Sequence, residues 1–551
     1  MRAAALYDAA PKPDSPGLKA LVAAALDAAC SAGATYAEVH VRVSQRELLH
    51  PPSTRFARGD QLLFDATPWQ THFNGLYYPP ERSTTLGFGI RALVQGAWGF
   101  AGSTELPTID RVAACGRTAA VQAKRAAQHQ SGVVELAPAP AVTGTWVMPG
   151  IDPIAVPLAE KLDVLGACAD AVPDLALNAL GGASAQLLTE ERTFASSEGA
   201  FTTQVTYTTG AQWNIGALVD PMEGSGAWFS NFLTPVGAGW EYIATQPFAE
   251  RARELIDYAG RLQRKTEAVQ VGRYDVVFDA YATAALLDDT LGTATELDRA
   301  MGALANSVGT SYLNDPVAML GTDQVAAPVV TVTTNRSMPG GAATVKWDDE
   351  GVVPRDTALI TNGQLTDFQT TRESATWLRP AYQRLGRQVV SNGCAHALGA
   401  TTPMSQRHPN MVLHPGAQAL TFDELVKGTK RGYAVLGHRP GNTNVYDIFG
   451  RVPQIMEDGT NDSQVMTGTF RGQYVVEIQN GQLGRWLGNA ELTYRTSELW
   501  RNVTALGGPS SVGIFGLERW REMAVDRTTH TVSAIPMLVA NVAITDARNR
   551  V

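Results

Sequence analysis

The stretch that decides the fold is residues 274–301, which read Tyr-Asp-Val-Val-Phe-Asp-Ala-Tyr-Ala-Thr-Ala-Ala-Leu-Leu-Asp-Asp-Thr-Leu-Gly-Thr-Ala-Thr-Glu-Leu-Asp-Arg-Ala-Met. The apolar residues 276–278 predict a short strand, and the Ala- and Leu-rich run after Asp279 predicts a helix of at least four turns. This helix carries three acids, Asp288, Asp289 and Glu296, with Thr293 between them. Because a strand that runs directly into a helix is a good place for chemistry, we expect the functional site here.

The same segment resembles the metal-binding helix of the TldD/PmbA family of zinc peptidases, whose pattern reads Leu-Leu-His-Glu-x-x-Gly-His-Ala-x-Glu-x-Asp. The positions that agree with this pattern are Leu286, Leu287, Gly292, Ala294, Glu296 and Asp298. The resemblance implies that Asp288 stands where the family has its first zinc histidine. It also implies that Asp289 replaces the general-base glutamate and Thr293 the second histidine. The frame of the motif is kept, and its zinc-binding residues are replaced.

Coordination chemistry indicates that the replaced residues are unsuited to bind zinc. Zinc in a peptidase takes about three protein ligands, usually imidazole, carboxylate or thiolate, and keeps one position for the water that it activates. Two side chains five residues apart on an ideal helix point about 140° apart, so the family motif requires a local distortion to aim both at one ion. Thr293 cannot replace an imidazole ligand, and Asp289 is one methylene too short for the general base. The helix therefore argues against zinc hydrolysis.

The family's third zinc ligand is a late cysteine, and the tract that corresponds to it here is residues 524–537. The resemblance aligns this cysteine with Asp526, so that all three ligand positions are altered together. An alternative is that Asp288, Asp289 and Asp526, with His530, form an oxygen-rich site for Mg²⁺, Mn²⁺ or Ca²⁺. The remaining histidines, His408, His414 and His438, have no metal-ligand spacing and are interpreted as ordinary loop histidines.

Three further blocks resemble the same family. Residues 86–101 predict a β-hairpin that turns at Gln95-Gly96 and continues through Trp98, and residues 237–241 match a glycine-aromatic-glutamate element. Residues 351–365 predict a second hairpin with its corner at Asn362-Gly363, and residues 474–483 repeat that pattern. The acids of residues 348–350 precede the second hairpin, and we interpret them as a solvated turn rather than a cation site.

The resemblance extends from about residue 17 to about residue 545 and implies an α+β chain of two domains. We place an N-terminal α/β domain at 17–265 and a β-rich C-terminal domain, which carries the altered motif, at 268–545. In the family, a groove or tunnel between the domains admits an unfolded peptide. Family members commonly pair, one active subunit with one inactive.

Composition excludes several other classes of function. The 551 residues carry a formal net charge of -9, which gives no general attraction to nucleic acid or to an anionic membrane. The sequence holds no run of about eighteen apolar residues, so we expect no membrane span and a cytoplasmic location. The four cysteines, Cys30, Cys115, Cys168 and Cys394, lie far apart, which disfavours a zinc knuckle or a disulfide framework. Cys394 lies close to His396, so a Cys/His nucleophile is conceivable there.

Three hypotheses for the function remain. The first is a pseudo-peptidase without zinc or another cofactor, which binds peptide or completes the peptide tunnel of a partner, as a homodimer or as a heterodimer with a paralogous subunit. The second is an active metal-dependent hydrolase that uses Asp288, Asp289 and Asp526. The third is a structural role in an assembly, suggested by the aromatic residues of the 69–78 segment.

Overall fold

The computed structural model describes residues 15–49, 81–130, 132–170, 179–220, 225–247, 250, 269–305, 309–436, 467–472, 475–487, 490–520 and 527–546. Its elements belong to an N-terminal half, with strands between residues 36 and 236, and a C-terminal half, with strands between residues 272 and 546. No sheet of the described residues mixes strands from the two halves. The boundary at residues 266–268 lies outside the described residues and stays a prediction, as does any role of the 69–78 segment.

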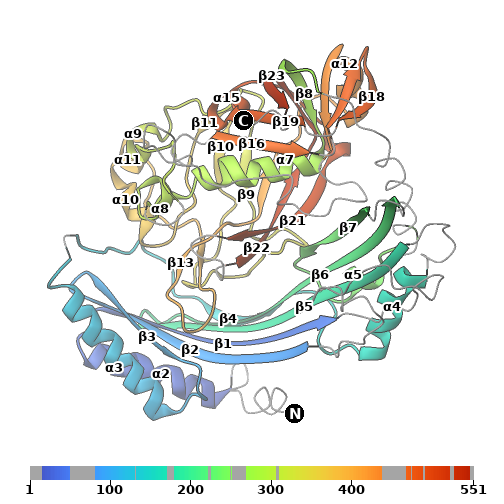
Figure 1. Ribbon diagram of the computed structural model, residues 1–551. Helices are drawn as coiled ribbons and strands as arrows, with labels where there is room; N and C mark the ends of the chain where they lie inside the picture. Colours follow the sequence, from blue (N-terminus) through green and yellow to red (C-terminus); the bar gives the residue numbers. More distant parts are fainter. Residues whose placement is uncertain are drawn as a thin grey trace.

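The N-terminal half is a long, curved sheet with helices on one face (Figure 1). Its strands, among the described residues, run in the order β3-β2-β1-β5-β6-β4, and β7 pairs with β6. Their bounds are β1 Tyr36–Leu49, β2 Glu81–Val94, β3 Ala97–Ser103, β4 Thr143–Val147, β5 Ala179–Ser196, β6 Phe201–Asp220 and β7 Ser225–Val236. The helices of this half are α2 Pro16–Ser31, α3 Ile109–Ala126, α4 Leu158–Asp170 and α5 Glu241–Ala244.

Hydrophobic packing explains why α2 and α3 cover one face of this sheet. Their small buried side chains, such as Ala25, Ala29, Ala119 and Ala123, form one core with apolar residues of β1 and β2. The alternation of β1 and β2 sends the other side chains to the opposite face. That face carries Arg42 and Arg91, and both are buried against the C-terminal half.

The C-terminal half contains two main sheets, which in the described residues run in the orders β16-β19-β23-β8-β15-β17-β18, where β20 also pairs with β23, and β11-β10-β9-β14-β22-β21. The strands of the first sheet are β8 Gly272–Phe278, β15 Arg431–Val435, β16 Thr467–Gly472, β17 Val475–Gln479, β18 Gln482–Leu487, β19 Ala490–Arg495, β20 Val503–Leu506 and β23 Met537–Asp546. The second sheet and a small β12–β13 pair comprise β9 Val332–Thr334, β10 Ala358–Thr361, β11 Gln364–Leu365, β12 Ala395–His396, β13 Ser405–Gln406, β14 Met411–Leu413, β21 Gly513–Trp520 and β22 Arg527–Ala534.

Short helices connect and cover these sheets. They are α7 Ala280–Leu287, the π-helical turn η2 Asp288–Gly292, α8 Leu297–Ala300, α9 Pro316–Met319, α10 Ser374–Trp377, α11 Arg379–Arg384, α12 Phe422–Gly428, α15 Thr496–Arg501 and the 3₁₀ turn η3 Pro509–Ser511. None of the helices in the described part of the chain is both long and apolar enough to cross a membrane.

The three predicted hairpins are confirmed, and their corners have the backbone that the sequence requires. Asn362 and Gly363 adopt φ of 50° and 80°, and Asn480 and Gly481 adopt 51° and 74°. Gln95 and Gly96 join β2 to β3 with φ of 50° and 77°. Two consecutive residues with positive φ form the turn whose twist matches a two-residue hairpin.

Candidate functional site

The predicted long helix is wrong in one respect, because it is interrupted where the altered motif begins. Asp279 caps the N-terminus of α7, with its Oδ1 accepting a hydrogen bond from the Ala282 N–H at 2.8 Å. After eight residues the α-helix becomes the π turn Asp288–Gly292, and the chain is extended at Glu296 before α8. Hydrogen bonds in a π-helix join residues five apart, so residues 288 and 293 are drawn towards the same side of the turn. This is the distortion that the motif spacing requires.

The π turn is held in a buried setting. The Trp500 Nε1–H donates to the Thr290 hydroxyl at 2.8 Å, and both side chains are buried. Most π-helices occur as single turns of this kind, frequently at functional sites. The backbone therefore has the distortion that the family motif requires, although the zinc-binding residues of the motif are replaced.

Asp288 makes a direct contact with an imidazole from β22. Its Oδ1 lies 2.8 Å from Nε2 of His530, and the two side chains are almost fully buried. Asp526, which the sequence aligned with the late family ligand, lies outside the described residues. The described side chain that contacts Asp288 is thus His530, which lies four residues after Asp526 in the sequence.

Thr293 directs its hydroxyl into its own helix. The hydroxyl donates to the carbonyl oxygens of Asp289 at 2.5 Å and of Thr290 at 3.0 Å. A buried hydroxyl used in this way bonds to backbone within its own turn. Asp289 itself is only partly buried.

A second buried acid–imidazole pair lies beside the first. Nε2 of His408 lies 3.2 Å from Oε1 of Glu296, and Oε2 of Glu296 accepts from Nε of Arg299 at 3.0 Å. The rings of His408 and His530 are stacked, with centroids 5.2 Å apart. We call Asp288, Glu296, His408 and His530 the imidazole cluster.

His408 lies in a loop, as expected, but it is buried and contacts an acid, which the sequence did not predict. Its partner Glu296 lies 112 positions earlier, and no spacing in the sequence reports such a pairing. The only sequence signal was that Glu296 is one of the positions that match the family pattern, which singles out the acid but not its imidazole partner.

These residues do not fit a catalytic zinc ion. Such a site needs about three protein donors and an open position, whereas Asp288 and His530 contact one another and Thr293 bonds to backbone. Within the described ranges, no three or more His, Cys, Asp or Glu side chains are grouped so that they could hold a metal. The carboxylate site of Asp288, Asp289 and Asp526 stays a prediction, since one member lies outside those ranges.

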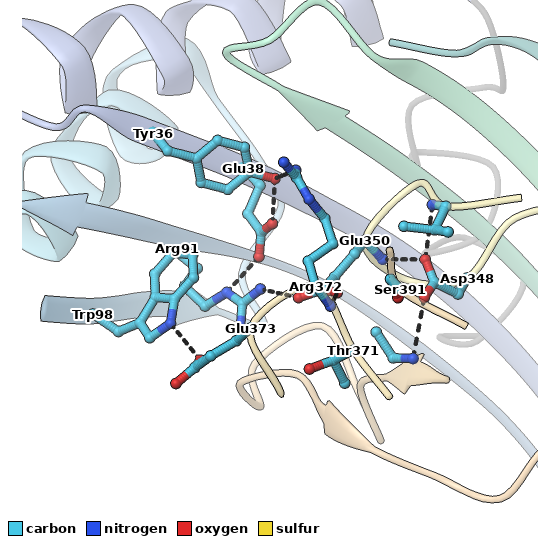
Figure 2. A network of polar contacts seen from close by, with 12 residues as sticks. Tyr36, Glu38, Arg91, Trp98, Asp348, Glu350, Thr371, Arg372, Glu373 and Ser391 are labelled. Atoms are coloured by element: carbon cyan, nitrogen blue, oxygen red, sulfur yellow. Dashed lines mark hydrogen bonds and ion pairs between the residues drawn. The ribbon is translucent and has the colours of Figure 1, made fainter. Parts of the chain in front are cut away.

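The acidic turn at residues 348–350 was predicted to be solvated, and this was wrong. All three side chains are buried. Arginines from the N-terminal sheet reach Asp349 and Glu350, whereas Asp348 accepts hydrogen bonds from the backbone N–H groups of Val352 and Ala395. The Arg42 Nη2 lies 3.0 Å from Oδ2 of Asp349, and the Arg91 Nη2 lies 2.9 Å from Oε1 of Glu350. Figure 2 shows Glu350 between Arg91 and Arg372, beside Glu38 and Tyr36. The turn therefore joins the two halves of the molecule.

Cys394 does not have the environment of a nucleophile. It is fully buried, and burial raises the pKa of its thiol to about 12. Nδ1 of the neighbouring His396 lies 3.3 Å from Oδ2 of Asp349, and burial lowers the pKa of this imidazole to about 4. A thiol of such high pKa carries almost no thiolate at neutral pH, so a Cys/His nucleophile is not supported.

A cavity of about 160 Å³ adjoins the imidazole cluster, with His408 in its wall. It lies between β1, β5 and β6 of the N-terminal sheet and strands and loops of the C-terminal half, β12 and β22 among them, so it lies between the two halves, where a groove was expected. Polar side chains dominate its lining, including Arg42, Arg192, Arg336 and Arg407.

Comparison with known proteins gives one consistent set of relatives. The family model of the PmbA/TldA metallopeptidase C-terminal domain matches residues 271–545. A metalloprotease of Methanothermobacter thermautotrophicus is 26% identical over 437 residues, which cover 78% of this chain and 83% of that protein. A metalloprotease of Methanocaldococcus jannaschii is 24% identical and is covered over 85% of its length by 72% of this chain.

Two solved structures share the fold. TldE from Thermococcus kodakarensis superimposes with a TM-score of 0.62 at 14% identity, over 94% of this chain and 98% of that one. A candidate modulator of DNA gyrase from Bacteroides thetaiotaomicron gives a TM-score of 0.64 at 13% identity, over 97% and 99% of the two chains. At such identities the likeness carries the fold alone, and it confirms the predicted α+β, two-domain architecture.

Proposed function

Because this chain belongs to the TldD/PmbA family of metallopeptidase-related proteins, we propose that it is a member without catalytic zinc, which binds an unfolded peptide between its two domains. We further propose that it acts as one subunit of a dimer, with a second copy or with a paralogous family subunit. The metalloprotease names of the archaeal relatives describe those proteins. From these names we carry over to this chain only the binding of a peptide, and not the cleavage of one.

The observation that carries this proposal is the contact between Asp288 and His530. At the position of the family's first zinc histidine, an acid lies 2.8 Å from an imidazole in a buried site. This contact pairs Oδ1 of Asp288 with Nε2 of His530 without an ion, while Nδ1 of His530 is buried with no hydrogen-bond partner among the described residues. Since Thr293 also bonds to backbone carbonyls, the side chains at both altered histidine positions of the π turn are engaged within the protein.

The proposal is tested by metal content, peptide cleavage and peptide binding in one preparation. The protein is equilibrated with zinc at neutral pH, freed of loose metal, and measured by elemental mass spectrometry. We expect well under one zinc per chain, no cleavage of a mixed peptide library, and retention of peptides from that library. A mass measurement of the native assembly then tests for a dimer.

Two variants make the test specific. Asp288→Ala removes the acid at the altered ligand position, and Asp298→Ala removes another acid of the same segment, which lies outside the Asp288–His530 pair. If the unaltered protein held stoichiometric zinc and cleaved peptides, and Asp288→Ala abolished both while Asp298→Ala did not, the protein would be an active metallopeptidase. The same assays with Mn²⁺ or Mg²⁺ test the carboxylate-metal alternative.

A further inference from the structure

The cavity beside the imidazole cluster contains more positive charge than its nearest acids neutralise. Two of its arginines, Arg42 and Arg192, share the acids Glu190 and Asp349, with nitrogen–oxygen distances of 3.0 Å for Arg42–Asp349 and 2.5 Å for Arg192–Glu190. Burial alone would raise the pKa of Glu190, but Arg192 and Arg42 outweigh it and hold the pKa at about 2. These two cations and two anions therefore compensate one another.

Arg336 is different, because it is a buried guanidinium with neutral partners. Its side chain is 4% exposed, and it donates to the carbonyl oxygens of Ala343 at 3.2 Å and of Gly393 at 2.8 Å. No carboxylate in the described ranges lies within 4 Å of its nitrogens, and Asp348 and Asp349 act on its charge from further away. A buried charge is costly unless an opposite charge accompanies it. Arg336 therefore lines the cavity as a cation that lacks a counter-charge at contact distance.

A second donor in the same wall also lacks an acceptor. Nε of Arg192 is buried and has no hydrogen-bond partner among the described residues. Buried N–H groups are nearly always paired, so this exception in a residue that lines the cavity calls for an acceptor, such as a water or an atom of a ligand. Thr528 and Thr529, on β22 just before His530, also line the cavity.

The volume and the neighbouring groups define what such a ligand can be. About 160 Å³ is several times the ~30 Å³ that a water molecule occupies in the liquid, so the cavity has room for a small anionic group. The His396 imidazole in the wall is neutral at neutral pH, because burial lowers its pKa. The positive charge that faces the cavity therefore comes from guanidinium groups, whose planar geometry suits a carboxylate.

We propose that this cavity binds a carboxylate group of the peptide ligand, with Arg336 as its ion-pair partner and Nε of Arg192 as a second donor. The identity of the ligand as a peptide rests on the proposed function, whereas the carboxylate site rests on the cavity and its arginines. The carboxylate is either the C-terminus of the peptide or an acidic side chain. His408 belongs both to this cavity wall and to the imidazole cluster, so the bound carboxylate lies next to that cluster.

The test compares three forms of one short peptide of small residues that carries a neutral fluorophore at its N-terminus. The first form has a free C-terminal carboxylate, the second a C-terminal amide, and the third an amide and one internal Asp. We expect fluorescence anisotropy to show that the free acid binds the unaltered protein about tenfold or more tightly than the plain amide, as for hydrogen bonds to a charged group. Tight binding of the third form would assign the site to acidic side chains, and weak binding would assign it to the C-terminus.

Variants link this preference to the cavity. Arg336→Met should abolish the difference between acid and amide, and Arg336→Lys should keep part of it. Arg372→Met removes an equally buried guanidinium that does not line the cavity, and it should leave the difference intact. If Arg336→Met retained the full preference, the proposed ion pair would be wrong.

The remaining outcomes separate this inference from the proposed function. Equal binding of acid and amide to the unaltered protein would overturn the carboxylate site and leave peptide binding standing. If no peptide bound, the proposed function would fail, and acetate would then test the cavity alone. Thermal stabilisation by acetate that is lost in Arg336→Met would support the site, and no stabilisation would refute it. Stronger stabilisation by inorganic phosphate than by acetate would overturn the choice of a carboxylate.

Discussion

Buried charges occur in two neighbouring regions of this molecule, and the two regions are balanced differently. In the interdomain network of Tyr36, Glu38, Arg91, Glu350 and Arg372, each charged group meets a partner (Figure 2). Arg91 lies 2.5 Å from Glu38 and 2.9 Å from Glu350, whose other oxygen accepts from the Arg372 backbone N–H at 2.7 Å.

The cavity lined by Arg336 lacks this balance. Arg336 donates to backbone carbonyls alone, although it is about as buried as Arg91. Breaking a fully paired network of buried charges lowers the stability of the fold strongly, and such a network has no charge left to bind a ligand. A cation in a cavity without an opposite charge in contact lowers stability, but it can bind an anionic ligand. A buried charge therefore does not by itself indicate a binding site. A buried charge without an opposite charge in contact with it does.

The largest expected effect is the loss of Arg91 from the interdomain network. Arg91→Met leaves Glu38 and Glu350 buried without their shared cation, and it removes the stacking of the guanidinium on Trp98. We expect the free energy of unfolding to fall by about 3–5 kcal/mol, measured by urea denaturation.

The control for that variant is an arginine in an exposed ion pair. Arg379 lies 2.5 Å from Glu135, but its side chain is 45% exposed and water screens the contact. Arg379→Met should change the free energy of unfolding by roughly 0–1 kcal/mol. A similarly small effect of Arg91→Met would mean that the interdomain network does not stabilise the fold.

The next effect is a dependence of stability on pH that arises from Glu38. Burial raises the pKa of this carboxyl, but Arg91 outweighs burial and holds the pKa at about 2, against an ordinary value of 4.5. Between these values the unfolded chain binds more protons than the folded chain, so the stabilisation is present above pH 4.5 and is lost as the pH falls towards 2. The difference corresponds to about 3 kcal/mol.

Glu38→Gln removes this titrating group and retains the others, although it also removes a negative neighbour that helps to raise the pKa of Glu350. The gap in unfolding free energy between the unaltered protein and Glu38→Gln should be constant from pH 7 to pH 5 and should narrow below pH 4.5. The gap is measured by denaturant titration at each pH. A gap that stayed constant down to pH 3 would contradict the low pKa.

Local features of the fold could be predicted from the sequence, since nearby residues determine them. The Asn-Gly pairs at 362–363 and 480–481 dictate their turns, because these residues tolerate positive φ. The strand before Asp279 and the start of the helix after it follow from apolar periodicity and a capping acid. The spacing of the motif required a distortion of the helix, and the π turn supplies it, but helical periodicity alone could not locate it.

Contacts between distant residues could not be predicted. The acids of residues 348–350 look solvated in the sequence, because their partners Arg42 and Arg91 lie 307 and 259 positions away. His408 contacts Glu296, and His530 contacts Asp288. His530 lies on β22, which pairs with β14 just after His408, and no local sequence pattern predicts this strand pairing. The sequence placed His530 near Asp288 only as one member of a carboxylate-rich site, and it did not predict the direct contact between the two side chains.

The smallest expected effect gives the sharpest contrast between the two regions. Arg336→Met removes a buried cation that lacks a counter-charge at contact distance, so the loss of two hydrogen bonds to carbonyl oxygens is offset by the relief of an unfavourable burial. We expect the unfolding free energy to change by less than about 1 kcal/mol in either direction, although Arg336 and Arg91 are the same residue type and similarly buried. A loss as large as that of Arg91→Met would show that Arg336 is part of the framework. A carboxylate that binds only the native state stabilises that state. If Arg336→Met changed the unfolding free energy little and also lost this stabilisation by the carboxylate, the function of the Arg336 charge would be to bind a ligand.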